Sequence, residues 1–310
     1  MGFYVLSYLC IMVFIGATGY LIYRQINLPL HVRWEIYPVQ HEITARTAYG
    51  GSYMEKVNWW NDKYENSRIN ELKYMVPEIL FLRGLWKENR SLWWFSFPLH
   101  FGLYLMIATF ALLLLHACFT LGGFSVGVVS FLLSGLIVAA GWSGLILGSI
   151  GSLGMFYRRL TDRSLRDYSS FSDYFNIIFI GLFFISALAT CLSGDSFLEG
   201  AKAYTFGLLT AGSSRNLYVP GQNVAGFLTI VSASLLVAYI PLTHMSHMFM
   251  KYFLYHNVKW DDVPNRRGGQ MEAAIKNNLE LKPTWQAKHI NADGHKSWRD
   301  IASSAPKEMK

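Results

Sequence analysis

Cysteine is scarce in this chain of 310 residues, which contains only Cys10, Cys118 and Cys191. No Cys-x-x-Cys pair occurs, so the chain carries no motif for an iron–sulfur cluster. No Cys-x-x-Cys-His occurs either, which excludes the covalent attachment site of haem c. Each cysteine lies in an apolar stretch, and we interpret all three thiols as small hydrophobic core residues.

Charged residues are also few, at 15% of the chain, whereas hydrophobic residues make up 52%. Five segments are long and nearly free of charge: 3–23, 97–121, 124–147, 174–192 and 224–250. Each meets the length of ~20 residues that a helix needs to span the hydrocarbon core of a bilayer. None shows the polar face of a surface helix in a soluble protein. The sequence therefore predicts an all-α membrane protein with five transmembrane helices.

Basic residues indicate the orientation of these spans. Of the 27 lysines and arginines, segments 24–95, 155–173 and 251–310 hold ten, four and eleven, whereas 195–223 holds two. By the positive-inside rule, the N-terminus lies outside and the C-terminus is cytoplasmic, in a prokaryotic cytoplasmic (inner) membrane. The net charge of +7 mostly reflects this topology, and we expect no nucleic acid partner. Residues 1–23 lack a basic start and a small-x-small cleavage site, which predicts a retained span.

Spans and loops divide the chain into four parts. Residues 1–24 are the first transmembrane helix, and 25–95 are a cytoplasmic loop that covers the membrane face or docks a cytoplasmic subunit. Residues 96–253 are a bundle of four transmembrane helices, and 254–310 are a polar cytoplasmic tail. Apolar residues recur at nearly helical period over 71–86, which predicts an amphipathic helix in the loop.

Two histidines lie at similar depths on different spans. His100 lies near the cytoplasmic end of the second span, and His247 near the cytoplasmic end of the fifth. Imidazole is a common axial ligand of haem iron, and a bis-histidine haem needs its ligands on opposite faces of one macrocycle. We therefore predict that His100 and His247 bind an inner haem b, with helices 2–5 as the haem-binding bundle. The alternative is two interfacial histidines that contact water or headgroups.

Three residues near this end are candidates for supporting roles. His244 lies three residues before His247, too close for a separate haem, so we interpret it as a hydrogen-bonding neighbour or a group near a propionate. Pro241 is expected to kink the fifth span and turn a histidine inward. Arg158 follows the third span, and it or Arg159 is a candidate partner of haem propionates.

Five glycines recur at steps of three and four in the third span: Gly141, Gly144, Gly148, Gly151 and Gly154. Small residues on one side of a helix permit close helix packing. The same stripe would leave room for a macrocycle, but we predict close packing as its purpose.

The outer face offers fewer candidate ligands. His116 lies ~24 Å beyond His100 along the helix and is rotated by ~160°, which suits the depth of a second haem but not a shared face. Lys202 is the only amine in the outer loop. Two interpretations stay open: His116 and Lys202 bind a second haem, or they belong to a quinone site. We also predict a short interfacial helix at 199–209, although a solvated loop fits the same charges.

Two stretches resemble the gamma subunit of respiratory nitrate reductase. They are Phe-Pro-Leu-His-Phe-Gly, which contains His100, and Pro-Leu-Thr-His-Met-Ser-His, which ends at His247. The resemblance is confined to the five spans, and it implies that this pair binds the inner haem. That family's outer ligands fall where Phe110 and a residue near Thr229 stand here. The resemblance therefore does not extend to an outer haem.

Beyond the spans, most of residues 31–290 is similar to the DsrM family, the membrane cytochrome b subunits of the Dsr complex associated with sulfite reduction. The similar stretches are His-Val-Arg-Trp-Glu-Ile-Tyr-Pro-Val (31–39), Gly-Gly-Ser-Tyr (50–53), Glu-Ile-Leu-Phe-Leu-Arg-Gly (78–84), Lys-Trp-Asp-Asp (259–262) and Trp-Gln-Ala-Lys-His-Ile (285–290). This similarity implies a heme b protein that uses menaquinone. Its partners would be a cytoplasmic iron–sulfur subunit resembling heterodisulfide reductase and other subunits of a Dsr-type complex.

We therefore expect an electron-transfer subunit of a quinone-linked oxidoreductase complex in sulfur-compound respiration. Without cysteine clusters of its own, the chain would relay electrons between menaquinone and the iron–sulfur subunit, with quinol oxidised near the outer face. The alternative class is a haem-free membrane anchor or transporter subunit. A transporter more often has interrupted helices or a repeat with ionisable groups at mid-membrane, and neither is evident.

Overall fold

The computed structural model describes residues 2–27, 67–124, 127–212, 223–247, 250, 252, 267–287 and 290–304. The chain divides into two compact units, Met1–Thr18 with Val76–Ser246, and Gly19–Met75 with His247–Lys310. The motifs at 31–39, 50–53 and 259–262 lie outside the described residues.

Five helices are long and apolar enough to cross a membrane: α1 (Gly2–Ile26), α5 (Arg90–Leu121), α6 (Val128–Thr161), α8 (Phe171–Leu192) and α10 (Val224–Leu242). They confirm the five predicted spans and, by length and composition, a multi-pass membrane protein. Helix α5 begins earlier than expected because Asn89 caps it, with its side chain accepting the N–H of Leu92 at 3.1 Å. Pro98 therefore lies inside the helix and not in its first turn.

The fifth span is shorter than predicted, since α10 ends at Leu242 and not at residue 250. Pro241 has no N–H to donate to the carbonyl four residues earlier, and Thr243 leaves the helix in an extended conformation (φ −126°, ψ 178°). A 3-10 turn, η3 (His244–Ser246), follows. Pro241 thus lies in the last turn of α10 and does not kink its middle, and His244 and His247 both lie beyond the helix.

The amphipathic helix predicted in the loop is two helices, α3 (Arg68–Phe81) and α4 (Arg83–Glu88). Leu82 separates them in the left-handed conformation (φ 52°, ψ 49°), which a residue with a side chain adopts infrequently. Glu78 stabilises this turn, because its Oε2 accepts the N–H of Gly84 at 2.8 Å. Helical periodicity continues across such a turn, so the sequence pattern did not show the break.

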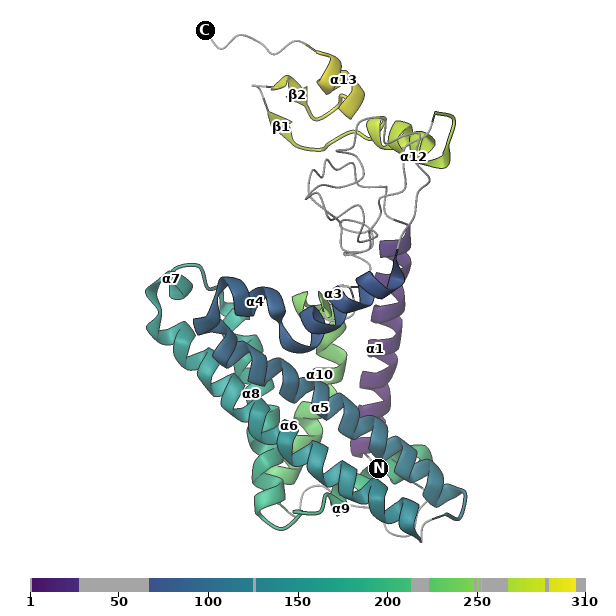
Figure 1. Ribbon diagram of the computed structural model, residues 1–310, viewed down its shortest axis with the longest axis vertical. Coiled ribbons are helices and arrows are strands. Elements are labelled where there is room, and N and C mark those ends of the chain that lie inside the picture. The colour runs from purple at the N-terminus through teal and green to yellow at the C-terminus, as the bar shows by residue number, and fades with distance from the viewer. Residues whose placement is uncertain are drawn as a thin grey trace. The chain divides into compact units, whose positions relative to one another are not determined.

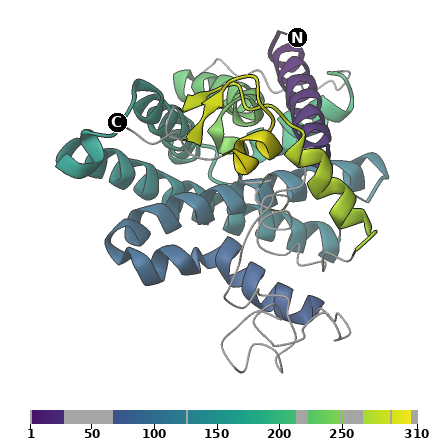
Figure 2. The ribbon, with the colours of Figure 1, turned by 90° about the horizontal axis from the view of Figure 1, so that it is seen from above.

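In the first unit, α5 packs along α6, α6 against α8, and α8 against α10 (Figure 1). Figure 2 shows α5 and α6 from above as two long neighbouring helices. Helix α9 (Glu199–Leu209), which confirms the short helix predicted there, lies at one end of the bundle (Figure 1). At the opposite end lie α4 and α7 (Arg163–Arg166), with Arg158 and Arg159 in the last turn of α6. We call the two ends the α9 end and the basic end.

The glycines of α6 allow its close contact with the neighbouring helices. A Cβ on Gly151 would lie 2.6 Å from the Cα of Leu99, and one on Gly102 would lie 2.6 Å from the backbone nitrogen of Gly148. Gly148 also faces the ring of Phe184 on α8. Close packing is confirmed as the role of the stripe, and these contacts show that α5 and α6 run antiparallel.

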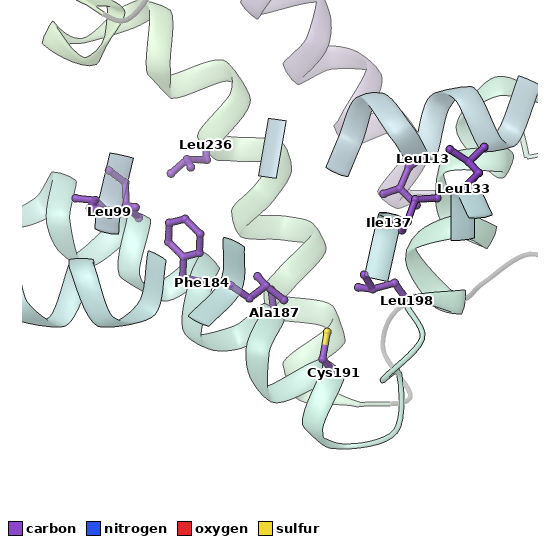
Figure 3. Packing of buried hydrophobic residues seen from close by; sticks show 11 residues of the cluster. Leu99, Leu113, Leu133, Ile137, Phe184, Ala187, Cys191, Leu198 and Leu236 are labelled. Carbon is purple, nitrogen blue, oxygen red and sulfur yellow. The ribbon is translucent and has the colours of Figure 1, made fainter. Parts of the chain in front are cut away.

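Buried apolar side chains from α5, α6, α8 and α10 form the core of the first unit (Figure 3). Leu113, Leu133, Ile137 and Leu198 converge in one part of it (Figure 3). Phe184 is fully buried in the other part, near Leu236 of α10 (Figure 3). Leu198 precedes α9, so the segment between α8 and α9 contributes directly to the core.

The three cysteines do not share one environment. Cys10 and Cys191 are buried, whereas Cys118 is exposed on α5. The prediction of three core thiols is therefore wrong for Cys118. Hydropathy does not separate these cases, because lipid and protein core are both apolar.

The second unit contains α12 (Gln270–Leu279), strands β1 (Gln286–Ala287) and β2 (Ala292–Asp293), and α13 (Trp298–Ser303). The strands pair antiparallel, and the rings of Trp285 and Trp298 meet edge to face with centroids 5.5 Å apart. The all-α prediction missed this small sheet, because two-residue strands are too short for an alternating pattern.

We predict that Gly151→Ala destabilises the bundle, whereas Gly135→Ala on the same helix does not. A Cβ at position 151 would overlap the backbone of Leu99, and overpacking costs about 1–3 kcal/mol. Nothing lies within 4 Å of a Cβ at position 135, where alanine has the better helix propensity. Thermal unfolding in detergent measures the difference, and equal midpoints for the two variants would contradict it.

Candidate functional site

His100 lies one helical turn after Ser96 on α5. Its Nδ1 lies 2.8 Å from the carbonyl oxygen of Ser96 and 3.3 Å from the Ser96 hydroxyl. A carbonyl oxygen only accepts, so Nδ1 donates its proton to it. The lone pair of the neutral ring then resides on Nε2. A histidine that ligates a metal commonly donates its other ring N–H to a backbone carbonyl in this way, which fixes both tautomer and ring orientation.

His244 has the opposite tautomer. Asn176 on α8 is buried, with 5% of its surface exposed, and its Oδ1 accepts a hydrogen bond from the Tyr239 hydroxyl at 2.7 Å. This bond directs the amide nitrogen toward His244, where Nδ2 lies 3.5 Å from Nδ1. An amide nitrogen only donates, so Nδ1 of His244 accepts and the ring proton resides on Nε2. The arrangement supports a hydrogen-bonding role for His244 and disfavours iron ligation through Nε2.

Asp173 of α8 adds a negative charge beside His244 and joins one more helix, α6, to the network. It interacts electrostatically with His244 and lies 3.6 Å from Nη1 of Arg159 on α6. The same Arg159 nitrogen donates to the hydroxyl of Ser169 at 2.9 Å. Polar contacts therefore tie the ends of α6 and α8 to the segment that carries His244.

Arg158 differs from its neighbour Arg159 in its partners. Its Nη2 lies 3.5 Å from Oδ2 of Asp162. Its Nη1 is buried and has no hydrogen-bond partner within the described part of the chain. A buried donor without an acceptor costs about 1–3 kcal/mol, and more when charged. This nitrogen therefore marks a place for an acceptor that the described part of the chain does not supply.

At the α9 end, the structure brings His116 and Lys202 together. Helix α9 packs against α5, and His116 interacts electrostatically with both Lys202 and Glu199. Lys202 is 8% exposed, and its Nζ donates to Oε1 of Glu199 at 2.8 Å, while the Glu199 side chain is 72% exposed. An ammonium that donates to a carboxylate has no lone pair for iron. The contact favours the quinone-site interpretation of Lys202 over haem ligation.

The segment before α9 holds the helix against the bundle. A carboxylate oxygen of Asp195 accepts a backbone N–H from the first turn of α9 at 3.0 Å. Leu198, in the left-handed conformation (φ 57°), packs its side chain against Gly141 of α6. The indole of Trp142 donates to the carbonyl of Ser196 at 2.8 Å. These contacts hold α9 against α5 and bury the side chain of Lys202.

His247 is exposed. It belongs to the second unit, whose C-terminal part begins at this residue, whereas His100 belongs to the first unit. The axial pair of His100 and His247 stays a prediction for this reason. Among the residues that the structure describes, no three His, Cys, Asp or Glu side chains gather as a multidentate metal site requires. Haem is held by one or two axial ligands, so that criterion does not apply to it.

Sequence reasoning did not single out Ser96, Asn176 or Tyr239. Ser96 precedes His100 by four residues, and this spacing places its carbonyl next to the ring on a helix. Asn176 is the only amide side chain in the fourth span, and an amide in an apolar helix indicates a partner on a neighbouring helix. Both signals are present in the sequence.

Comparison with known proteins identifies no relative of this chain. No protein-family model matches it, and neither a curated protein nor a solved structure does. The interpretation of the site rests on the residues of this chain and on the resemblance of its sequence motifs.

We predict that Tyr239 and Asn176 are energetically coupled. A double-mutant cycle of Tyr239→Phe and Asn176→Leu should give a coupling energy of about 0.5–1.5 kcal/mol, as expected for one interhelical hydrogen bond. Unfolding in detergent provides the four free energies. The ring of Tyr157 is 64% exposed, so a parallel cycle with Tyr157→Phe should give a coupling near zero. Equal couplings in the two cycles would refute the contact.

Proposed function

We propose that this chain is the haem b subunit of a membrane complex that relays electrons between a quinone and a cytoplasmic iron–sulfur protein. The observation that carries the proposal is the hydrogen bond from Nδ1 of His100 to the Ser96 carbonyl at 2.8 Å. It gives His100 the tautomer of an iron ligand through Nε2. The five spans, the absence of cysteine clusters and the family resemblance support the same conclusion.

The residues of the basic end suit a haem. His100 and His247 would be its axial ligands, and the bound haem would supply one-electron transfer. The chain's own contribution is orientation. Ser96 fixes the ring of His100, and Asn176 holds His244, three residues before His247. From the resemblance, the quinone is menaquinone and the partner is a heterodisulfide-reductase-like subunit in a prokaryotic cytoplasmic membrane.

At the α9 end, we assign Lys202 and Glu199 to quinol oxidation. A quinol that becomes a quinone releases two electrons and two protons, so its site needs proton acceptors with access to water. Lys202 is buried, and the carboxylate it contacts is largely exposed, which links the interior to solvent. His116 interacts with both groups and is either a hydrogen-bond partner of the quinol or a ligand of a second haem.

A transporter subunit is the alternative from another class. Transporters commonly bind substrate at helices that are broken near mid-membrane. Here α5, α6 and α8 are continuous over 32, 34 and 22 residues. The continuity of these helices favours an electron-transfer subunit.

We predict that purified protein shows the reduced-minus-oxidised spectrum of a b-type cytochrome and releases its haem on extraction. His100→Ala and His247→Ala should each lose most of the inner haem, because one axial ligand is removed. His295→Ala, which changes an exposed histidine outside the site, is the matched control. Wild-type protein without a b-type band would end the haem proposal, and full haem content in either ligand variant would refute that assignment.

We predict that Lys202→Met keeps the wild-type haem content but slows haem reduction by a menaquinol analogue at least tenfold. The Lys202 ammonium holds the Glu199 carboxylate at 2.8 Å, and this carboxylate is the proton acceptor of the pair. General base contributions are ~10²–10⁴-fold, so a displaced base should slow the reaction. Dithionite reduction should be unchanged. Lys276→Met, which breaks an exposed ion pair with Glu272, is the control. Loss of one of two haems in Lys202→Met would make Lys202 a ligand.

His116→Ala separates the two roles of that residue in the same assays. Loss of one haem per chain would identify His116 as a second-haem ligand. Unchanged haem with slow quinol oxidation would place His116 in the quinone site.

A further inference from the structure

Arg158 and Arg163 make the same local ion pair in different surroundings. Each pairs with an aspartate four residues later, Arg158 with Asp162 at 3.5 Å and Arg163 with Asp167 at 3.8 Å. The side chain of Arg163 is 86% exposed, whereas that of Arg158 is 17% exposed. A guanidinium has five N–H donors, and one aspartate cannot satisfy them. Water can complete the shell of Arg163 but has little access to Arg158.

The donor without a partner is Nη1 of Arg158. Three other buried side-chain atoms of the described residues lack a partner, and all are neutral hydroxyl oxygens: Tyr4, Thr18 and Ser149. A buried charged donor needs an acceptor more strongly than a hydroxyl does. The neighbouring Arg159 has acceptors in Ser169 and Asp173. Among these described residues, the missing charged acceptor is therefore particular to Arg158, and an anionic ligand would supply it.

The position of Arg158 indicates where that group comes from. Gly154 packs against Phe95 in the antiparallel pair of α5 and α6, and Arg158 lies one turn beyond Gly154, toward the start of α5. That start carries Trp93 and Trp94, of which Trp94 is 61% exposed. Tryptophan is enriched at the headgroup level of membranes. Arg158 thus lies in the layer where lipid phosphates are present.

We propose that Nη1 of Arg158 binds a phosphate oxygen of an anionic phospholipid at the basic end of the bundle. Arginine binds phosphate through charge-assisted hydrogen bonds in a planar fork, and basic pockets between transmembrane helices bind anionic headgroups. Asp162 pairs with Nη2 of Arg158 and leaves Nη1 to bind this ligand. The site goes beyond the proposed electron transfer and does not depend on it. The competing acceptor is a haem propionate.

Native mass spectrometry of the full-length protein tests the site. Wild type, Arg158→Gln, Arg158→Lys and Arg163→Gln would be incubated in detergent with cardiolipin, phosphatidylglycerol or phosphatidylcholine. We expect Arg158→Gln to weaken retention of the two anionic lipids about tenfold, as loss of a charged hydrogen bond does. Arg163→Gln removes the same charge from the same kind of ion pair and should match wild type. Arg158→Lys should fall between them, because it keeps the charge without the fork.

Gel filtration and thermal unfolding show which variants are folded. If Arg158→Gln does not fold, Arg158→Lys is compared with Arg163→Gln in its place. Equal lipid retention in the folded Arg158 variant and in Arg163→Gln would overturn the proposal. Haem content and midpoint potential are measured on the same samples. A change confined to the haem, with lipid retention unchanged, would assign Arg158 to a propionate and overturn the lipid site as well.

Discussion

The structure depends on one constraint: the interior of a bilayer offers polar groups no water, so the protein must supply their hydrogen-bond partners. Each polar side chain in the spans therefore indicates a contact. Thr190 of α8 meets Thr229 of α10 at 3.1 Å, and Ser7 of α1 meets Ser234 of α10 at 2.7 Å. The bonds at His100 and Asn176 follow the same rule. Such contacts fix which helices are neighbours, and at His100 and His244 they also decide where the imidazole proton resides.

Glycine sets the distances over which these polar contacts form. The glycine stripe of α6 lets α5 approach until Gly102 contacts the backbone of Gly148. Gly102 lies two residues after His100. The same stripe leaves room for Phe184 of α8. Larger residues along α6 would move both α5 and α8 away from α6. The position of His100 therefore follows from small residues that have no chemistry of their own.

Hydropathy and charge predicted five helices, and the structure has a long apolar helix at each position. Helix α5 begins before the predicted span, and α6 continues to Thr161, well beyond the predicted end at residue 147. The fifth failed at its C-terminus, because apolar composition continues through Pro241 and Thr243 while the backbone does not. The candidate residues were found because histidine and lysine are conspicuous in apolar sequence. Their partners were missed, although the four-residue spacing from Ser96 to His100 and the amide of Asn176 in an apolar span are signals that the sequence contains. Lys202 is buried because the segment before α9 packs onto α6 through Leu198. This is a tertiary contact, and local periodicity in the sequence does not predict it.

In the relay that we propose, the two ends of the bundle would serve different physical needs. At the basic end, the bond to the Ser96 carbonyl fixes one tautomer of His100, which would suit the iron ligand that we propose, because such a ligand keeps its geometry while the charge at the iron changes. At the α9 end, a buried ammonium contacts a carboxylate that reaches water. Oxidation of a quinol needs that second condition, because its protons must leave. The proposed quinone-linked relay would need a rigid end for electrons and a water-connected end for protons, and the hydrogen bonds described at the two ends support this division.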